Sequence, residues 1–76
     1  MKIQEFIESF REGSKSRQFV EILKYGTRVE SSRIKEKMEY SKLSLISRQI
    51  NEQNKGYKLY SEYANGRWFW QMKKDK

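Results

Sequence analysis

The chain has 76 residues, which is enough for one small domain. It contains neither cysteine nor histidine, which excludes disulfides, thiolate metal sites and the histidine-dependent hydrolase and zinc centres. The formal net charge is +7, and residues 41–76 carry eight bases against three acids. This surplus either keeps a small domain dissolved or attracts a polyanion such as nucleic acid, and we favour the polyanion.

Targeting segments and catalytic motifs are not evident in the sequence. No apolar run approaches the roughly 18–20 residues that span a bilayer, and charges interrupt residues 1–10. We therefore expect a cytoplasmic protein with no membrane partner, associated with the nucleoid if it binds DNA. There is no glycine-rich phosphate loop, and the carboxylates are scattered among bases. The sequence thus predicts that the protein is not an enzyme and has no catalytic residue, metal site, cofactor or evident small-molecule ligand.

Four apolar residues near the N-terminus recur with the spacing of one helix face. They are Ile3, Phe6, Ile7 and Phe10. Gly13 is suited to ending this helix. The stripe either packs inside one chain or forms a contact between two chains. We expect a homodimer contact, because residues 1–13 are the only segment with a net negative charge and the basic faces of two DNA-bound protomers would repel.

A second helix and a short strand are expected next. Ser14 or Ser16 can cap a helix that runs to about Tyr25, and Gly26 ends it. The inward-facing residues of this helix are Phe19, Val20, Ile22 and Leu23. Residues 27–29 include two β-branched side chains and predict a very short strand.

Two further helices follow, separated by a turn at residues 39–41. Ser31 or Ser32 can cap the first of them, and the second runs over about residues 42–54. Their apolar positions predict inner faces made of Ile34 and Met38, then Leu43, Ile46 and Ile50. A polar stripe without a carboxylate recurs at helical spacing on the second of these helices. It consists of Ser44, Arg48, Asn51 and Lys55.

The apolar period changes from 3.6 to 2 after Gly56, which predicts a β-hairpin. Asn65-Gly66 favours a two-residue type I′ turn, because both turn positions need a positive φ. This turn pairs Ala64 with Arg67, Tyr63 with Trp68, Ser61 with Trp70, and Leu59 with Met72. That face is the more apolar one, so we expect both tryptophans to close the core. The alternative is stacking of single-stranded bases on the outer face, which would carry Tyr60 and Phe69 near Lys58 and Lys73.

Several of these segments match one known pattern. It is a strand leading into a capped helix, a turn, a second helix with an S-R-x-I sequence, and a hairpin that begins near N-E-x-G-Y. The matching residues are Val29–Ile34 with Met38, Ser47–Ile50, Asn51-Glu52, Gly56–Glu62 and the tip at Asn65-Gly66. On these residues, the stretch from Phe19 to Trp70 resembles the winged helix-turn-helix domains of bacterial regulators, most closely those of the biotin-repressor type.

The resemblance implies an α+β, mostly α, winged helix-turn-helix domain, to which the N-terminal helix, outside the shared pattern, is an addition. We therefore expect a single domain made of that amphipathic helix at residues 1–13, a helical core at 14–54 and a wing hairpin at 57–73. It also implies that the fourth helix enters the major groove of double-stranded DNA, while the wing reaches the adjacent minor groove or backbone. We therefore expect a sequence-specific DNA-binding protein that acts as a small stand-alone transcriptional regulator or architectural factor.

The expected DNA-binding residues combine groups that contact base edges with groups that contact phosphates. Arginine pairs with guanine, asparagine or glutamine with adenine, and lysine or serine with phosphate. The set is Lys42, Ser44, Ser47, Arg48, Gln49, Asn51, Lys55, Lys58, Asn65 and Arg67. Two alternatives remain open, namely a protein–protein interaction module with the same fold and an excisionase-like or replication accessory protein that bends DNA.

Overall fold

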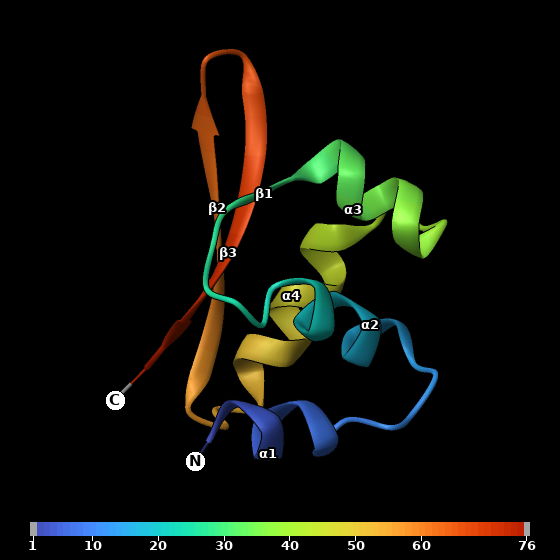
Figure 1. The fold of residues 1–76 in the computed structure, drawn as a ribbon, viewed down its shortest axis with the longest axis vertical. Helices are drawn as coiled ribbons and strands as arrows, with labels where there is room; N and C mark the ends of the chain where they lie inside the picture. The colour runs from blue at the N-terminus through green and yellow to red at the C-terminus, as the bar shows by residue number, and fades with distance from the viewer. Residues whose placement is uncertain (1, 76) are drawn as a thin grey trace.

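The computed structural model describes residues 2–75, which form four helices and one three-stranded antiparallel sheet (Figure 1). In chain order the elements are α1 (Ile3–Glu8), α2 (Lys15–Ile22), β1 (Val29–Glu30), α3 (Ser31–Met38), α4 (Leu43–Glu52), β2 (Tyr57–Ala64) and β3 (Arg67–Lys74). The predicted α+β class, with its helices ahead of a C-terminal hairpin, is confirmed. Within residues 2–75, none of the helices has the length and hydrophobicity needed to cross a bilayer.

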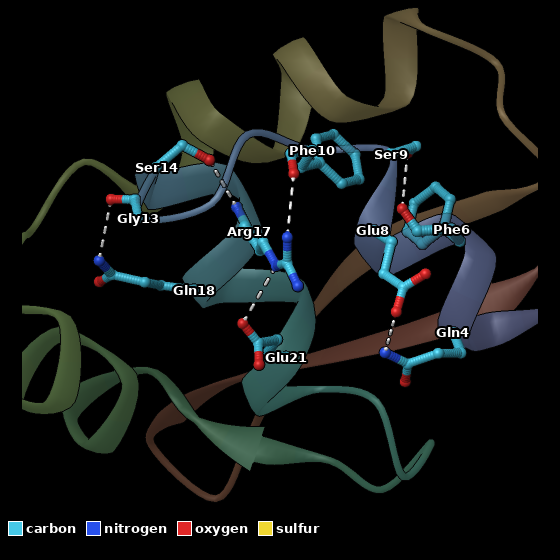
Figure 2. Close-up of polar contacts among 10 residues, drawn as sticks. All are labelled: Gln4, Phe6, Glu8, Ser9, Phe10, Gly13, Ser14, Arg17, Gln18 and Glu21. Carbon is cyan, nitrogen blue, oxygen red and sulfur yellow. Dashed lines mark hydrogen bonds and ion pairs between the residues drawn. The ribbon is translucent and has the colours of Figure 1, made fainter.

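Local capping chemistry fixes the start of α2. The hydroxyl of Ser14 accepts a hydrogen bond from the backbone N–H of Arg17 at 3.1 Å, as one of the two predicted caps would do (Figure 2). The helix ends at Ile22 rather than at the predicted Tyr25. The chain tightens there, because the N–H of Gly26 bonds to the carbonyl of residue 23, three positions back, at 3.0 Å.

The region from β1 to α4 differs from the expectation in small ways. The strand covers Val29–Glu30 instead of the predicted residues 27–29, and neither predicted serine caps α3. The Ser32 hydroxyl instead donates to the carboxylate of Glu30 at 2.7 Å. Residues 39–42 join α3 to α4, and Glu39 takes the left-handed conformation with φ of 52°. Such a residue commonly closes a helix C-terminus, although glycine fills the position at lower steric cost.

The hairpin register predicted from the turn is confirmed. Asn65 and Gly66 have φ of 53° and 77°, and all four predicted cross-strand pairs are present. The strand order is β1-β3-β2, so β3 is central and the short β1 pairs with it at Trp70 and Phe69. The hairpin extends beyond the helices, and its turn forms one extremity of the molecule (Figure 1).

A single core lies between the helices and one face of the hairpin. α2 contacts the other three helices, while α4 covers β2 and α3 covers β3. The sheet contributes Leu59, Trp70 and Met72 to this core. The opposite face of the hairpin carries Lys58, Tyr60 and other polar or partly exposed residues. The apolar alternation of the strands therefore points toward the helices, as the sequence predicts.

The apolar stripe of α1 belongs to this same core. Phe6 is completely buried, Ile7 and Phe10 are buried, and Ile3 packs partly against them. The ring of Phe6 lies 5.2 Å from that of Phe10 and 4.9 Å from that of Tyr57. The expected dimer contact through these side chains is therefore wrong, because their own chain already covers the rings.

Candidate nucleic-acid interface

The outward face of α4 carries the strongest candidate contacts. Leu43, Ile46 and Ile50 point into the core, as their spacing predicts. The exposed residues on the other side are Ser44, Leu45, Arg48, Gln49 and Glu52. Within residues 2–75, the side chains of Ser44, Arg48 and Gln49 form no hydrogen bond or ion pair, so they are free to contact an external group.

The side chain of Asn51 joins α4 to β2 by hydrogen bonds. Its side-chain Nδ2 donates to the carbonyl of Leu59 at 3.0 Å, and its Oδ1 accepts from the N–H of Leu59 at 2.8 Å. β2 is an edge strand, so these two backbone groups have no strand partner and the amide satisfies both. Both polar atoms of the Asn51 amide are thus already engaged within the protein, so the predicted adenine contact would have to break these bonds or use the one N–H hydrogen and the lone pair that they leave.

Ser47 is also unavailable for DNA. It is buried, and its hydroxyl donates to the carbonyl of Ser44 at 2.9 Å within the same helix. Its position between Ile46 and Ile50 places it toward the interior. The prediction that Ser47 contacts phosphate is wrong for this reason.

Two of the predicted phosphate-binding lysines contact other parts of the protein. Lys55 Nζ donates to the Ser9 carbonyl at 3.4 Å and to its hydroxyl at 3.3 Å, and it lies 4.6 Å from the centre of the Phe10 ring. Lys58 lies on the outer face of the hairpin and pairs with Asp75 at 3.7 Å. Both are remote from the hairpin tip, at the end of the molecule where α1 and the base of the hairpin lie (Figure 1). Lys42, at the start of α4, is exposed and, among the described residues, has no ion-pair partner.

The hairpin tip carries the other predicted cation. Arg67 follows the turn directly, and its side chain is 69% exposed although Nη1 lies 3.2 Å from Glu30 Oε2. Asn65 occupies the first turn position and is exposed. An ion pair this exposed contributes roughly 0–1 kcal/mol, so the guanidinium can exchange Glu30 for another anion at small cost.

The two tryptophans of β3 differ in burial. Trp70 is 6% exposed and packs edge-on against Phe19 at 5.4 Å between ring centres. Trp68 is 53% exposed, and its ring contacts only that of Tyr63 among the aromatic rings of residues 2–75. The expectation that both tryptophans close the core is wrong for Trp68. The side chains of α3 and α4 that face Trp68 do not close over it but leave an open cleft beside its ring.

A cleft of about 250 Å³ lies where the hairpin leaves the helices. Trp68, Trp70 and Ser61 line it from the hairpin, and side chains of α3, α4 and the turn between them line it from the other side. The latter are Ser31, Lys35, Ser41, Leu43 and Ser44. Because Ser44 belongs also to the exposed face of α4, the cleft and that face form one continuous surface.

The outer face of the hairpin is a weaker candidate for stacking. Tyr60 is about half exposed, and Lys73 Nζ lies 5.9 Å from the centre of its ring. Phe69 is half-buried beneath the guanidinium of Arg28, at 4.8 Å. Arg28 in turn pairs with Glu62 at 2.9 Å, so one of the two rings is already covered by an ion-paired side chain.

The sequence did not predict three residues of this surface. They are the exposed Leu45 on α4, and the exposed Lys35 and partly exposed Ser31 in the cleft. Leu45 lies about 100° around the helix from Ser44, outside the predicted polar stripe but still away from the buried face. Within the described residues, no cluster of three or more His, Cys, Asp or Glu side chains could hold a metal ion. No protein-family model matches the chain, and neither a curated protein nor a solved structure matches it.

Proposed function

We propose that the chain is a sequence-specific double-stranded DNA-binding protein with a winged helix-turn-helix arrangement. In this proposal α3, the turn at residues 39–42 and α4 form the helix-turn-helix, and the β2–β3 hairpin is the wing. The protein acts as a small stand-alone transcriptional regulator or an architectural factor. The observation that carries the proposal is the exposed face of α4, on which Arg48 and Gln49 have no partner within residues 2–75.

The chemistry of that face suits base edges in the major groove. A major groove about 12 Å wide admits one α-helix, in which Arg48 can bind guanine and Gln49 can bind adenine with two hydrogen bonds each. Leu45 adds an apolar group of the kind that contacts a thymine methyl. With Asn51 and Ser47 engaged internally, we expect each protomer to discriminate at about two or three base pairs.

The surrounding cations supply affinity that does not depend on sequence. Lys42 lies at the first turn of α4, Arg67 lies at the wing tip, and the net charge of the chain is +7. If about six phosphates are neutralised, log affinity should fall against log salt with a slope of about −5. Fluorescence anisotropy with a labelled duplex between about 50 and 200 mM salt measures this slope. No binding at the lowest salt concentration would contradict the proposal.

Base readout is tested by selection of bound sequences from a random duplex pool, followed by Arg48→Ala. This substitution should cost roughly 1–3 kcal/mol of affinity on the selected site and relax the preference at one or two positions. Lys55→Ala is the matched control, because Lys55 contacts Ser9 and should leave the selected sequence unchanged. Equal losses on all sequences in Arg48→Ala would leave only an architectural role, in which the protein binds or bends DNA without reading bases.

A protein–protein interaction module is the second candidate, and the exposed apolar residues Leu45, Tyr63 and Trp68 are the observation that favours it. In that case the same surface would bind a partner protein, with the aromatic rings as anchors. The salt titration separates the two candidates, because apolar contacts depend only weakly on ionic strength and phosphate contacts depend on it steeply.

A further inference from the structure

Two aromatic rings near the turn of the hairpin are exposed to solvent. Tyr63 and Trp68 lie on the face that carries the core nearer the helices, yet they are 60% and 53% exposed. They are cross-strand neighbours, and their ring centres are 5.2 Å apart at 62°. The contact between the rings helps to hold the strands together, but most of both rings still faces solvent. An exposed aromatic pair beside a cleft is typical of a surface that takes a ligand.

The cleft beside Trp68 has two chemically different sides. The hairpin side offers the indoles of Trp68 and Trp70, and the helix side offers the ammonium of Lys35 and several hydroxyls. Lys35 forms no ion pair within residues 2–75. The volume of about 250 Å³ lies below the roughly 300–1,000 Å³ of pockets that take drug-sized ligands. A planar group of the size of one nucleobase fits these dimensions, with an attached anion at the lysine.

We infer that the cleft binds one unpaired nucleotide of a DNA strand. Its base stacks on the exposed indole of Trp68, and its phosphate contacts Lys35 and the nearby serine hydroxyls. The inference rests on the proposed function, because α4 must bring the strand to the cleft through the face that Ser44 shares with it. Stacking on an aromatic side chain accepts any base, so this contact selects DNA structure rather than sequence. The preferred substrate is therefore a duplex with an extrahelical base next to the site bound by α4.

Three labelled duplexes of equal length test the inference with the full chain. One is fully paired, one carries a single bulged adenine, and one carries an abasic residue at the bulge. The abasic duplex keeps the flexibility of the bulge but offers no base to stack. We expect the adenine bulge to bind about tenfold tighter than the other two in fluorescence anisotropy. It should also quench the tryptophan emission, and because Trp70 lines the same cleft, Trp68→Ala is needed to assign the quenching to Trp68.

Paired variants locate the contact. Trp68→Ala should abolish both the tenfold preference and the quenching, whereas Tyr60→Ala, an exposed ring on the opposite face of the same strand pair, should preserve them. Lys35→Gln tests the phosphate side from α3 without altering the hairpin, and it should reduce the preference by about threefold. The preference is a ratio of two affinities measured on one protein sample, so a partly unfolded variant does not change it.

The possible results separate the inference from the proposed function. An abasic bulge that binds as tightly as the adenine bulge overturns the inference, because flexibility alone would then be recognised. A preference that survives in Trp68→Ala also overturns it. Absence of binding to the paired duplex overturns the proposed function. If a Trp68-dependent affinity for the adenine bulge persists in that case, it still supports the cleft as a nucleotide site.

Discussion

The two ends of the molecule use similar side chains in opposite ways. At one end, which we call the closed end, lie α1, the last turn of α4 and the base of the hairpin. Several of its side chains are buried or contact other residues, as Phe6, Asn51 and Lys55 illustrate. At the other end, the open end, lie the hairpin tip, α3 and the start of α4, where Trp68 and Lys42 remain exposed.

The difference shows that residue type alone does not assign a role in a domain this small. An asparagine on a helix beside a sheet edge completes the hydrogen bonding of the strand, whereas Arg48, one turn earlier, faces solvent. The side chains that stabilise the fold and those available to a ligand are separated by position along the same helix and hairpin. Substitutions at the closed end should therefore alter stability, and substitutions at the open end should alter binding.

The largest effect is expected for the pair Phe6→Ala and Trp68→Ala. Phe6 is fully buried, so its truncation should lower the free energy of unfolding by about 3–5 kcal/mol. Trp68→Ala removes one exposed cross-strand contact and should cost about 1 kcal/mol or less. Urea denaturation followed by circular dichroism measures both values. Similar losses of unfolding free energy in the two variants would contradict the claim that only the closed end stabilises the fold.

The next largest effect is expected for Asn51→Ala and Arg48→Ala, of which the first should mainly lower stability and the second should mainly weaken DNA binding. Asn51→Ala leaves the N–H and carbonyl of Leu59 without their partner and should cost about 1–3 kcal/mol of stability. Arg48→Ala should change stability by less than about 0.5 kcal/mol while weakening DNA binding. Thermal unfolding and anisotropy on the same two proteins provide the comparison. A folded Asn51→Ala protein that loses base preference would return Asn51 to the DNA-binding set.

The smallest effect is expected for two lysines. Lys42→Ala should reduce the steepness of the salt dependence by about one, the amount expected for one lost phosphate contact. Lys55→Ala should leave the slope unchanged, because its ammonium contacts Ser9 at the closed end. Anisotropy titrations at four salt concentrations resolve a change of this size. A reduced slope in Lys55→Ala would show that the closed end also contacts DNA.

The sequence was sufficient where structure depends on neighbours along the chain. The Asn65-Gly66 turn determined the pairing of all eight residues in each hairpin strand, and the apolar spacing identified the inner face of α4. The errors arose from contacts between distant positions. Lys55 meets Ser9 across 46 residues, and no local pattern indicates that pairing. Trp68 lies on the predicted face, but its exposure depends on how closely α3 and α4 pack against the hairpin, and they leave a cleft beside it.

The amide of Asn51 has a consequence for self-association of the sheet. The exposed edge of a strand can recruit a second strand and begin aggregation. Here β1 covers two residues of β3 on one side of the sheet, and on the other edge both outward groups of Leu59 are occupied by one side chain. Intermolecular strand addition is thereby prevented near the start of β2, at the base of the hairpin. The protein can thus be present at high local concentration without its sheets joining through that part of the strand.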